Sequence, residues 1–221
     1  MFRRAVLALC LVFVTAASAA ERAPGRPAIA SAHPLATAAG HEMIAMGGNA
    51  FDAAVAVAAA LTVVEPTGSG LGGGGFLLLH RASDDLYTMI DAREKAPGAS
   101  TRDMFLDAKG DPDRKLATES GLAAGIPGEP AALEYLAQKY GKLPLATSLQ
   151  PAIRLARDGF PLYMRLQSGI RGKAAQFRKT RDAERVFLVD GEVPPLGHVI
   201  RQPDLAATLE LIAAKGAKGF Y

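Results

Sequence analysis

Apolar residues recur along this chain at spacings that predict helices over much of its length. From 34 to 46, and again from 203 to 215, they return every three or four residues, which is the period of an amphipathic helix. Residues 50–64 are apolar almost throughout, a pattern typical of a helix that is buried on all sides or spans a membrane. This stretch contains Asp52 and is shorter than the span of about 20 residues that a bilayer requires, so we expect it to be buried. Asn49 is a good cap for it, and the proline at 66 ends it.

Two short apolar runs, 76–80 and 86–91, lie on either side of a polar turn and predict a β-hairpin. Residues 28–32 are also apolar and predict an opening strand. Residues 98–118 are predicted to be irregular, and helices are predicted to begin near 126–130 and 143–144. Residues 165–185 are predicted to form a solvated basic helical face, and residues 193–197 a loop.

Residues 68–73 read Gly-Ser-Gly-Leu-Gly-Gly and match the fingerprint of a dinucleotide-binding loop letter for letter. That fingerprint requires a strand before the loop and a helix after it, because the helix N-terminus binds the pyrophosphate. The predicted order here is the reverse, and no Lys-Ser/Thr pair follows to make a P-loop. A nucleotide-binding protein is therefore a weak alternative. We expect instead a loop that packs tightly against another backbone, close to a pocket.

The first 19 residues have the three parts of a secretory signal peptide. Arg3 and Arg4 precede an apolar run over 5–14, and Ala17-Ser-Ala19 offers a small-x-small cleavage site. We therefore divide the chain into a signal peptide, 1–19, and a mature portion, 20–221. This predicts an exported protein, periplasmic or extracellular, with no stable membrane span.

Composition is ordinary for a globular protein, with 49% apolar and 21% charged residues among 221. Removal of residues 1–19 takes away the single cysteine, Cys10, together with two arginines and no acid, so the formal net charge falls from +3 to +1. The mature portion thus has no thiol chemistry. No basic stripe interleaved with aromatic residues is visible, so nucleic acid is not expected as a partner.

Arg93 is the residue that the sequence singles out as a candidate ligand-binding group. It follows the second strand of the predicted hairpin and lies between Asp91 and Glu94. An arginine flanked by acids commonly forms structural ion pairs, so that interpretation stays open. A guanidinium is also the natural partner of a free carboxylate, because its fork donates two parallel hydrogen bonds.

Other candidate chemistry is sparse. The four histidines are far apart and lack metal-ligand spacing, so no metal and no cofactor is predicted. No Gly-x-Ser-x-Gly elbow occurs, and the candidate serines have no obvious base in sequence. The histidines are His33, His41, His80 and His198, and the candidate serines are Ser31, Ser69 and Ser120.

Five segments together resemble the large subunit of the γ-glutamyltransferases, also called glutathione hydrolases. They span essentially the whole mature portion, and the final Gly219-Phe-Tyr221 is similar to the opening of a further family motif. The segments are Gly47-Gly-Asn-Ala-x-Asp-Ala-Ala, Val63-Val-Glu-Pro66, Ser69-Gly-x-Gly-Gly-Gly-Gly-Phe76, Asp91-x-Arg-Glu-x-Ala-Pro97 and Gly125-Ile-Pro-Gly128.

The resemblance implies an α/β fold, here an incomplete and helix-rich portion of the α/β/β/α sandwich of the N-terminal-nucleophile hydrolases. It implies a precursor that cleaves itself, and a small subunit that begins with the nucleophilic threonine. The implied reaction takes the γ-glutamyl group from glutathione or a similar compound and passes it to water, an amino acid or a peptide. By this resemblance, Arg93 holds the α-carboxylate of the γ-glutamyl group.

The catalytic threonine is expected beyond Tyr221, because the family places it in a Thr-x-His context and no histidine here has a threonine two positions earlier. No catalytic residue is therefore assigned within these 221 residues, and the small subunit is an expected partner. Part of an apolar sandwich should be left uncovered. Two alternatives remain: a glutaryl-cephalosporin acylase of the same superfamily, and a non-catalytic remnant or binding subunit.

Overall fold

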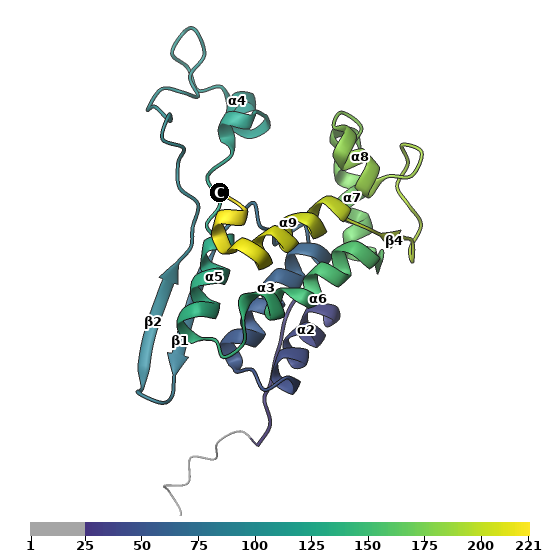
Figure 1. Ribbon diagram of the computed structural model, residues 1–221. Helices are drawn as coiled ribbons and strands as arrows, with labels where there is room; N and C mark the ends of the chain where they lie inside the picture. Colours follow the sequence, from purple (N-terminus) through teal and green to yellow (C-terminus); the bar gives the residue numbers. More distant parts are fainter. Residues whose placement is uncertain (1–24) are drawn as a thin grey trace, which may run out of the picture.

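Helix α3 (Ala50–Val64) lies at the centre of the molecule, with other helices packed around it (Figure 1). The computed structural model describes residues 25–221, so the predicted signal peptide lies outside the described residues. Helices α2 (Pro34–Ala45), α5 (Glu129–Tyr140) and α6 (Leu145–Asp158) all pack against α3. The predicted buried helix is confirmed, since most of the alanines and valines along α3 are buried, although Ala54 is exposed.

The start of α3 is built as the sequence predicts and is also tied to a distant loop. Asn49 and Asp52 form a reciprocal capping box, in which the side chain of each residue accepts a hydrogen bond from the backbone N–H of the other. The fully buried Asp52 carboxylate also accepts hydrogen bonds from the backbone N–H groups of Lys142 and Leu143, at 3.0 Å. This clamp holds the loop between α5 and α6 against α3.

The predicted hairpin is confirmed as β1 (Phe76–Arg81) and β2 (Leu86–Asp91), an antiparallel pair in which Leu78 lies opposite Met89. Side chains alternate between its two faces. Leu79 and its neighbours pack on the helical core, whereas the outer face exposes an apolar group. The exposed side chains of that outer face are Phe76, Leu78, Tyr87 and Met89.

Helix α9 (Pro203–Lys215) packs on α6 and begins and ends where the sequence predicts. Three predictions need correction. Residues 28–32 form no strand. The segment 98–118 is largely irregular but contains the start of helix α4 (Arg114–Glu119). The stretch 165–185 is not one solvated face, because it divides into two helices and the first of them buries apolar side chains against the core.

The remaining elements are short or peripheral. They are η1 (Gly121–Ala123), β3 (Phe160–Pro161), α7 (Met164–Phe177), α8 (Arg181–Phe187), β4 (Val199–Ile200), which pairs with β3, and η2 (Gly216–Gly219). Two lobes rise from the helical core (Figure 1). Residues 97–124, including α4, form one, and the other contains α7 and α8. No helix within residues 25–221 has both the length and the apolar character to cross a membrane.

Candidate functional site

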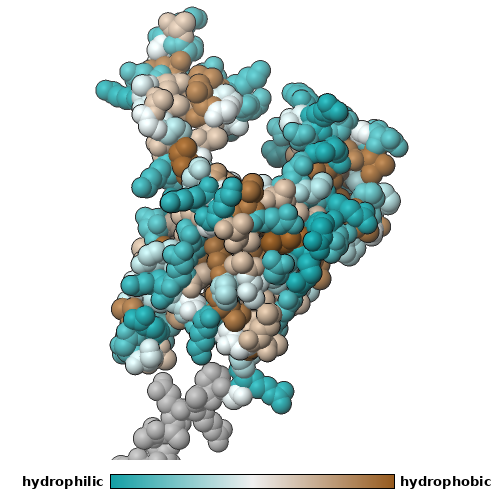
Figure 2. Space-filling model, viewed as in Figure 1, coloured by the Kyte–Doolittle hydropathy of each residue, from teal (hydrophilic) through white to brown (hydrophobic). Residues whose placement is uncertain are grey.

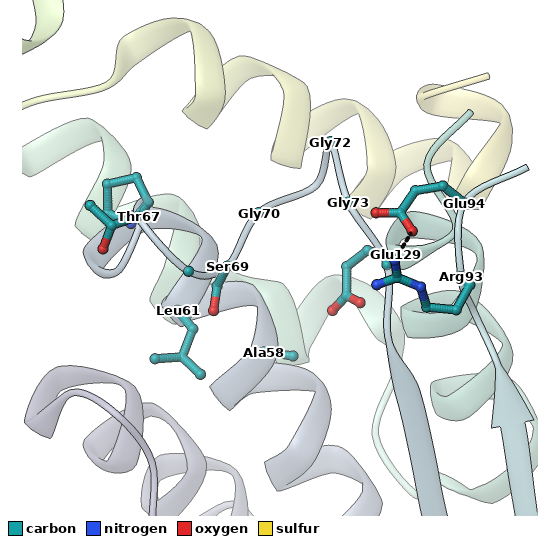
Figure 3. Close-up of a pocket in the computed structure, with 13 residues that line it drawn as sticks. Ala58, Leu61, Thr67, Ser69, Gly70, Gly72, Gly73, Arg93, Glu94 and Glu129 are labelled. Carbon is teal, nitrogen blue, oxygen red and sulfur yellow. Dashed lines mark ion pairs between the residues drawn. The ribbon is translucent and has the colours of Figure 1, made fainter. Parts of the chain in front are cut away.

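A cavity of about 570 Å³ opens beside the C-terminal end of α3 (Figure 3). The glycine-rich loop, residues 66–74, lines one side of it, and α3 contributes Ala58 and Leu61. Three charged side chains complete the lining: Arg93, Glu94 and Glu129. The cavity therefore brings together the end of a helix, the end of a strand and the beginning of another helix, which are far apart in the sequence.

The glycine loop connects α3 to β1, so its order is helix, loop, strand. The element directly before residue 68 is a helix and the element directly after residue 75 is a strand, which removes the structural basis for a dinucleotide site. The predicted tight packing is confirmed. A Cβ atom at Gly74 or at Gly128 would overlap the backbone carbonyl of Ala92. Both positions must therefore lack a side chain for the backbones to approach so closely.

The loop also fixes the residue that precedes Arg93. Ala92 donates its backbone N–H to the carbonyl of Gly75 at 2.9 Å, and Gly75 donates its own N–H to the carbonyl of Ala92 at 3.2 Å. On the other side, the carbonyl of Gly73 accepts hydrogen bonds from the first N–H groups of α5, those of Gly128 and Glu129, at 3.1 Å. Strand end, glycine loop and α5 thus form one hydrogen-bonded unit.

The Arg93 side chain is 56% exposed and extends from this unit into the cavity (Figure 3). One of its terminal nitrogens lies 3.3 Å from the Glu94 carboxylate. Asp91 does not pair with the guanidinium, and instead accepts a hydrogen bond from the Arg93 backbone N–H at 3.0 Å. Of the two acids that flank Arg93 in the sequence, Glu94 therefore forms an ion pair with the guanidinium and Asp91 does not. One ion pair orients the guanidinium and leaves much of it open to the cavity.

Glu129 is a cavity residue that the sequence reasoning missed. It is the first residue of α5, and its half-buried carboxylate has no hydrogen bond or ion pair among the described residues. Burial raises the pKa of this carboxyl above its ordinary value. The sequence does contain a signal for Glu129, because it directly follows the Gly125-Ile-Pro-Gly128 motif. A glycine motif of this kind packs closely on another backbone segment, and an acid at the start of the following helix therefore lies beside that segment.

Of the candidate serines, only Ser69 lines this cavity, and no histidine does. The hydroxyl of Ser31 is 2.8 Å from that of Thr37, and that of Ser120 bonds to the carbonyl of Leu116. Within residues 25–221, no three side chains of the kinds that bind metals gather in one place. The described residues thus build a cavity lined by Arg93, Glu94 and Glu129, without a nucleophile and a base in contact.

The gamma-glutamyltranspeptidase family profile matches residues 36–221. The chain belongs to this family. It is 42% identical over 194 residues to the glutathione hydrolase proenzyme of Escherichia coli (strain K12), an alignment that covers 87% of this chain and 33% of the relative. The Helicobacter pylori gamma-glutamyltranspeptidase structure matches with a TM-score of 0.84 and 38% identity, covering 90% of this chain and 58% of that chain.

Cephalosporin acylase from Bacillus halodurans also matches, with a TM-score of 0.75 and 29% identity, over 90% of this chain and 40% of that chain. The gamma-glutamyltranspeptidase family and this acylase therefore share the fold, and the predicted α/β class of N-terminal-nucleophile hydrolase is confirmed. The chain spans about a third of the length of the curated relatives it matches. The described part of the chain is rich in helices.

Proposed function

We propose that this protein transfers or hydrolyses γ-glutamyl groups of glutathione and related compounds, and that Arg93 binds the α-carboxylate of the γ-glutamyl group. The observation that carries the proposal is the open guanidinium in a cavity walled by glycine backbone. A carboxylate can accept two parallel hydrogen bonds from such a fork, which sets both position and orientation. Family membership supplies the reaction class.

The bond-making group is proposed to come from a small subunit of the same precursor. In this mechanism a threonine hydroxyl, with its own free amine as base, attacks the γ-carbonyl carbon. The bond to the leaving amine breaks and that amine takes up a proton, leaving a threonyl ester. Water or the amine of an amino acid then attacks the ester and regenerates the hydroxyl. The word proenzyme in the name of the Escherichia coli relative supports a cleaved precursor.

Exposed apolar surface supports the same proposal for the partner. The outer face of the hairpin presents Leu78 at 82% exposure and Phe76 at 62%, which is unusual for side chains of this size. The space-filling view also shows hydrophobic residues on the lobe of residues 97–124, where Leu122 is 52% exposed (Figure 2). We propose that the small subunit covers the hairpin face. We also propose export, on the basis of the signal-peptide pattern over 1–19.

The first test is the chain composition of the protein purified from its source, by intact mass and N-terminal sequencing. A second, smaller chain beginning with threonine, together with release of a chromophore from a γ-glutamyl anilide, is the expected result. A single chain ending at Tyr221 without that activity would favour the alternative of a non-catalytic binding subunit.

The acylase alternative is separated by substrate. A glutaryl amide lacks the α-amino and α-carboxylate groups that a γ-glutamyl amide carries. We expect turnover of the γ-glutamyl anilide and little turnover of the glutaryl amide, and the reverse preference would identify an acylase. The higher identity and TM-score of the gamma-glutamyltranspeptidase match favour the first outcome.

Replacement of Arg93 tests the binding role directly. Arg93→Ala should raise KM for a γ-glutamyl anilide roughly 30- to 700-fold, because it removes a charge-assisted bidentate contact worth about 2–4 kcal/mol. Arg93→Lys should recover only part of this, since an ammonium cannot donate the parallel pair. Arg157→Ala is the matched control, because Arg157 is also 56% exposed, pairs with the adjacent Asp158 and lies outside this cavity. An unchanged KM in a folded Arg93→Ala enzyme would remove Arg93 from the site.

A further inference from the structure

A buried carboxylate lies at the end of α3, directly before the glycine loop. Glu65 is the C-cap of that helix and is only 3% exposed. Both features are unfavourable for a negative charge, because burial removes its hydration and the C-terminal end of a helix repels it. Such a residue persists only where specific partners compensate it.

Three partners do so, and two of them come from the segment that opens α7. The Tyr163 hydroxyl lies 2.6 Å from one oxygen of Glu65, and the Thr67 hydroxyl lies 2.7 Å from the other. Arg165 lies 3.7 Å away. Burial alone would raise the pKa of Glu65, but the hydrogen bonds from Tyr163 and Thr67 and the charge of Arg165 together hold it below its ordinary value. The ring of His33 packs on Tyr163 with 4.9 Å between centroids.

The same residue positions the beginning of the glycine loop. The backbone carbonyl of Glu65 accepts hydrogen bonds from the N–H groups of Gly68 at 3.1 Å and Ser69 at 3.0 Å, while its carboxylate holds Thr67. Thr67, Gly68 and Ser69 all line the cavity, and Thr67 and Ser69 lie on the side away from Arg93 (Figure 3). One side chain and one carbonyl thus fix this wall.

The end of α3 has no other local cap. Helices commonly end on a glycine that turns the chain and satisfies the last carbonyls, but Pro66 follows Glu65 here. The carbonyl of Val64 instead lies 2.9 Å from the Tyr163 hydroxyl, and that of Val63 accepts a hydrogen bond from the Gln202 side chain. The position of the loop therefore depends on contacts with α7 and with the segment before α9.

We propose that Glu65 and Tyr163 are positioning residues, which hold the Thr67–Ser69 wall at the distance from Arg93 that a γ-glutamyl ligand requires. This rests on the function proposed above. Neither side chain lines the cavity. Their effect on the ligand is transmitted through Thr67 and through the backbone of the loop.

The test uses the active protein and three substitutions that keep shape: Glu65→Gln, Tyr163→Phe and Thr67→Val. Each should raise KM for a γ-glutamyl anilide with little change in kcat, by about 10-fold for Glu65→Gln and about 3-fold for the other two, changes within the range of the net contribution of a single hydrogen bond. Glu65→Gln and Thr67→Val should be non-additive in KM when combined, because they break one linkage. Glu42→Gln is the control, since Glu42 makes an exposed ion pair with Arg154 away from the cavity.

A merely structural role predicts a different pattern. The melting temperature would then fall while KM stays constant, and the changes caused by Glu65→Gln and by Thr67→Val would add in the double variant. That pattern would overturn the proposal, as would an equal rise of KM in Glu42→Gln. If Glu65→Gln fails to fold, the KM values of Tyr163→Phe and Thr67→Val still test the proposal. Tyr163→Phe deletes only a hydroxyl, and Thr67→Val replaces a hydroxyl with a methyl group. If the unaltered protein turns over no γ-glutamyl substrate, the proposed function itself fails, and this inference fails with it.

Discussion

Single residues in the cavity differ in how their charges are balanced. Arg93 pairs with Glu94 at 3.3 Å, whereas the Glu129 carboxylate has no partner among the described residues. A half-buried carboxyl of this kind favours its protonated form, which is why its pKa is raised. The folded state therefore stabilises the charged form of Glu129 poorly, a feature typical of binding sites.

This predicts the effect of Glu129→Gln on stability. Because the folded state binds the proton more tightly than the unfolded state, the Glu129 contribution to stability falls as pH rises through the raised pKa. The substitution should therefore raise the melting temperature at about pH 8 and leave it nearly unchanged at about pH 3, below the ordinary pKa of a glutamate, where the carboxyl is protonated in both states. Thermal melts at both values measure this. Glu119→Gln, at an exposed position, is the control. A lower melting temperature for Glu129→Gln at the higher pH would mean that the carboxylate has a stabilising partner.

At the scale of elements, the glycine loop is a spacer that lets three backbones meet. Its four consecutive glycines are not equivalent. A Cβ at Gly74 would overlap the Ala92 carbonyl, whereas a Cβ at Gly72 would meet nothing within 4 Å. Only some of these glycines are therefore required by packing.

We expect Gly74→Ala to destabilise the fold by about 1–3 kcal/mol and to raise KM, because the Ala92 peptide and hence Arg93 must move. Gly72→Ala should stay within about 0.5 kcal/mol of the unaltered protein. Urea unfolding and steady-state kinetics of the two variants make the comparison. Equal effects from both would show that the whole loop needs glycine for its conformation rather than for close approach.

At the scale of the whole molecule, the hairpin is half covered. Leu77 and Ile90 pack on the helices, but Leu78 and Met89, which lie opposite each other on the outer face, are 82% and 57% exposed. A two-stranded sheet with an apolar outer face and unpaired edges is a template for association.

The chain purified without any other polypeptide should therefore self-associate, and Leu78→Lys should reduce this by placing a charge on the apolar face. Light scattering and size-exclusion chromatography over a concentration series measure the effect. Leu196→Lys is the control, because Leu196 is 52% exposed in a loop away from the hairpin. A monodisperse monomer at all concentrations would argue that this face needs no cover.

Local patterns were sufficient to predict several elements and to single out one residue that lines the cavity. The bounds of α9, the Asn49 cap of α3 and the hairpin depend on periodicity and on residues a few positions apart, which a sequence displays directly. Arg93 could be singled out because it follows a predicted strand and belongs to a motif that resembles the γ-glutamyltransferases. The strand predicted at 28–32 was wrong because a short apolar run forms a strand only where a partner strand is available.

The rest was decided by tertiary structure, because it depends on which distant segments meet. Glu65 and Tyr163 are 98 positions apart in the sequence, and the Lys142 N–H that donates to Asp52 is 90 positions from it. Glu129 enters the cavity because the start of α5 packs against the carbonyls of Gly73 and Ala92. Periodicity determines which face of an element is apolar, but the burial, the pairing and hence the chemistry of a polar side chain depend on the surface that this face packs against.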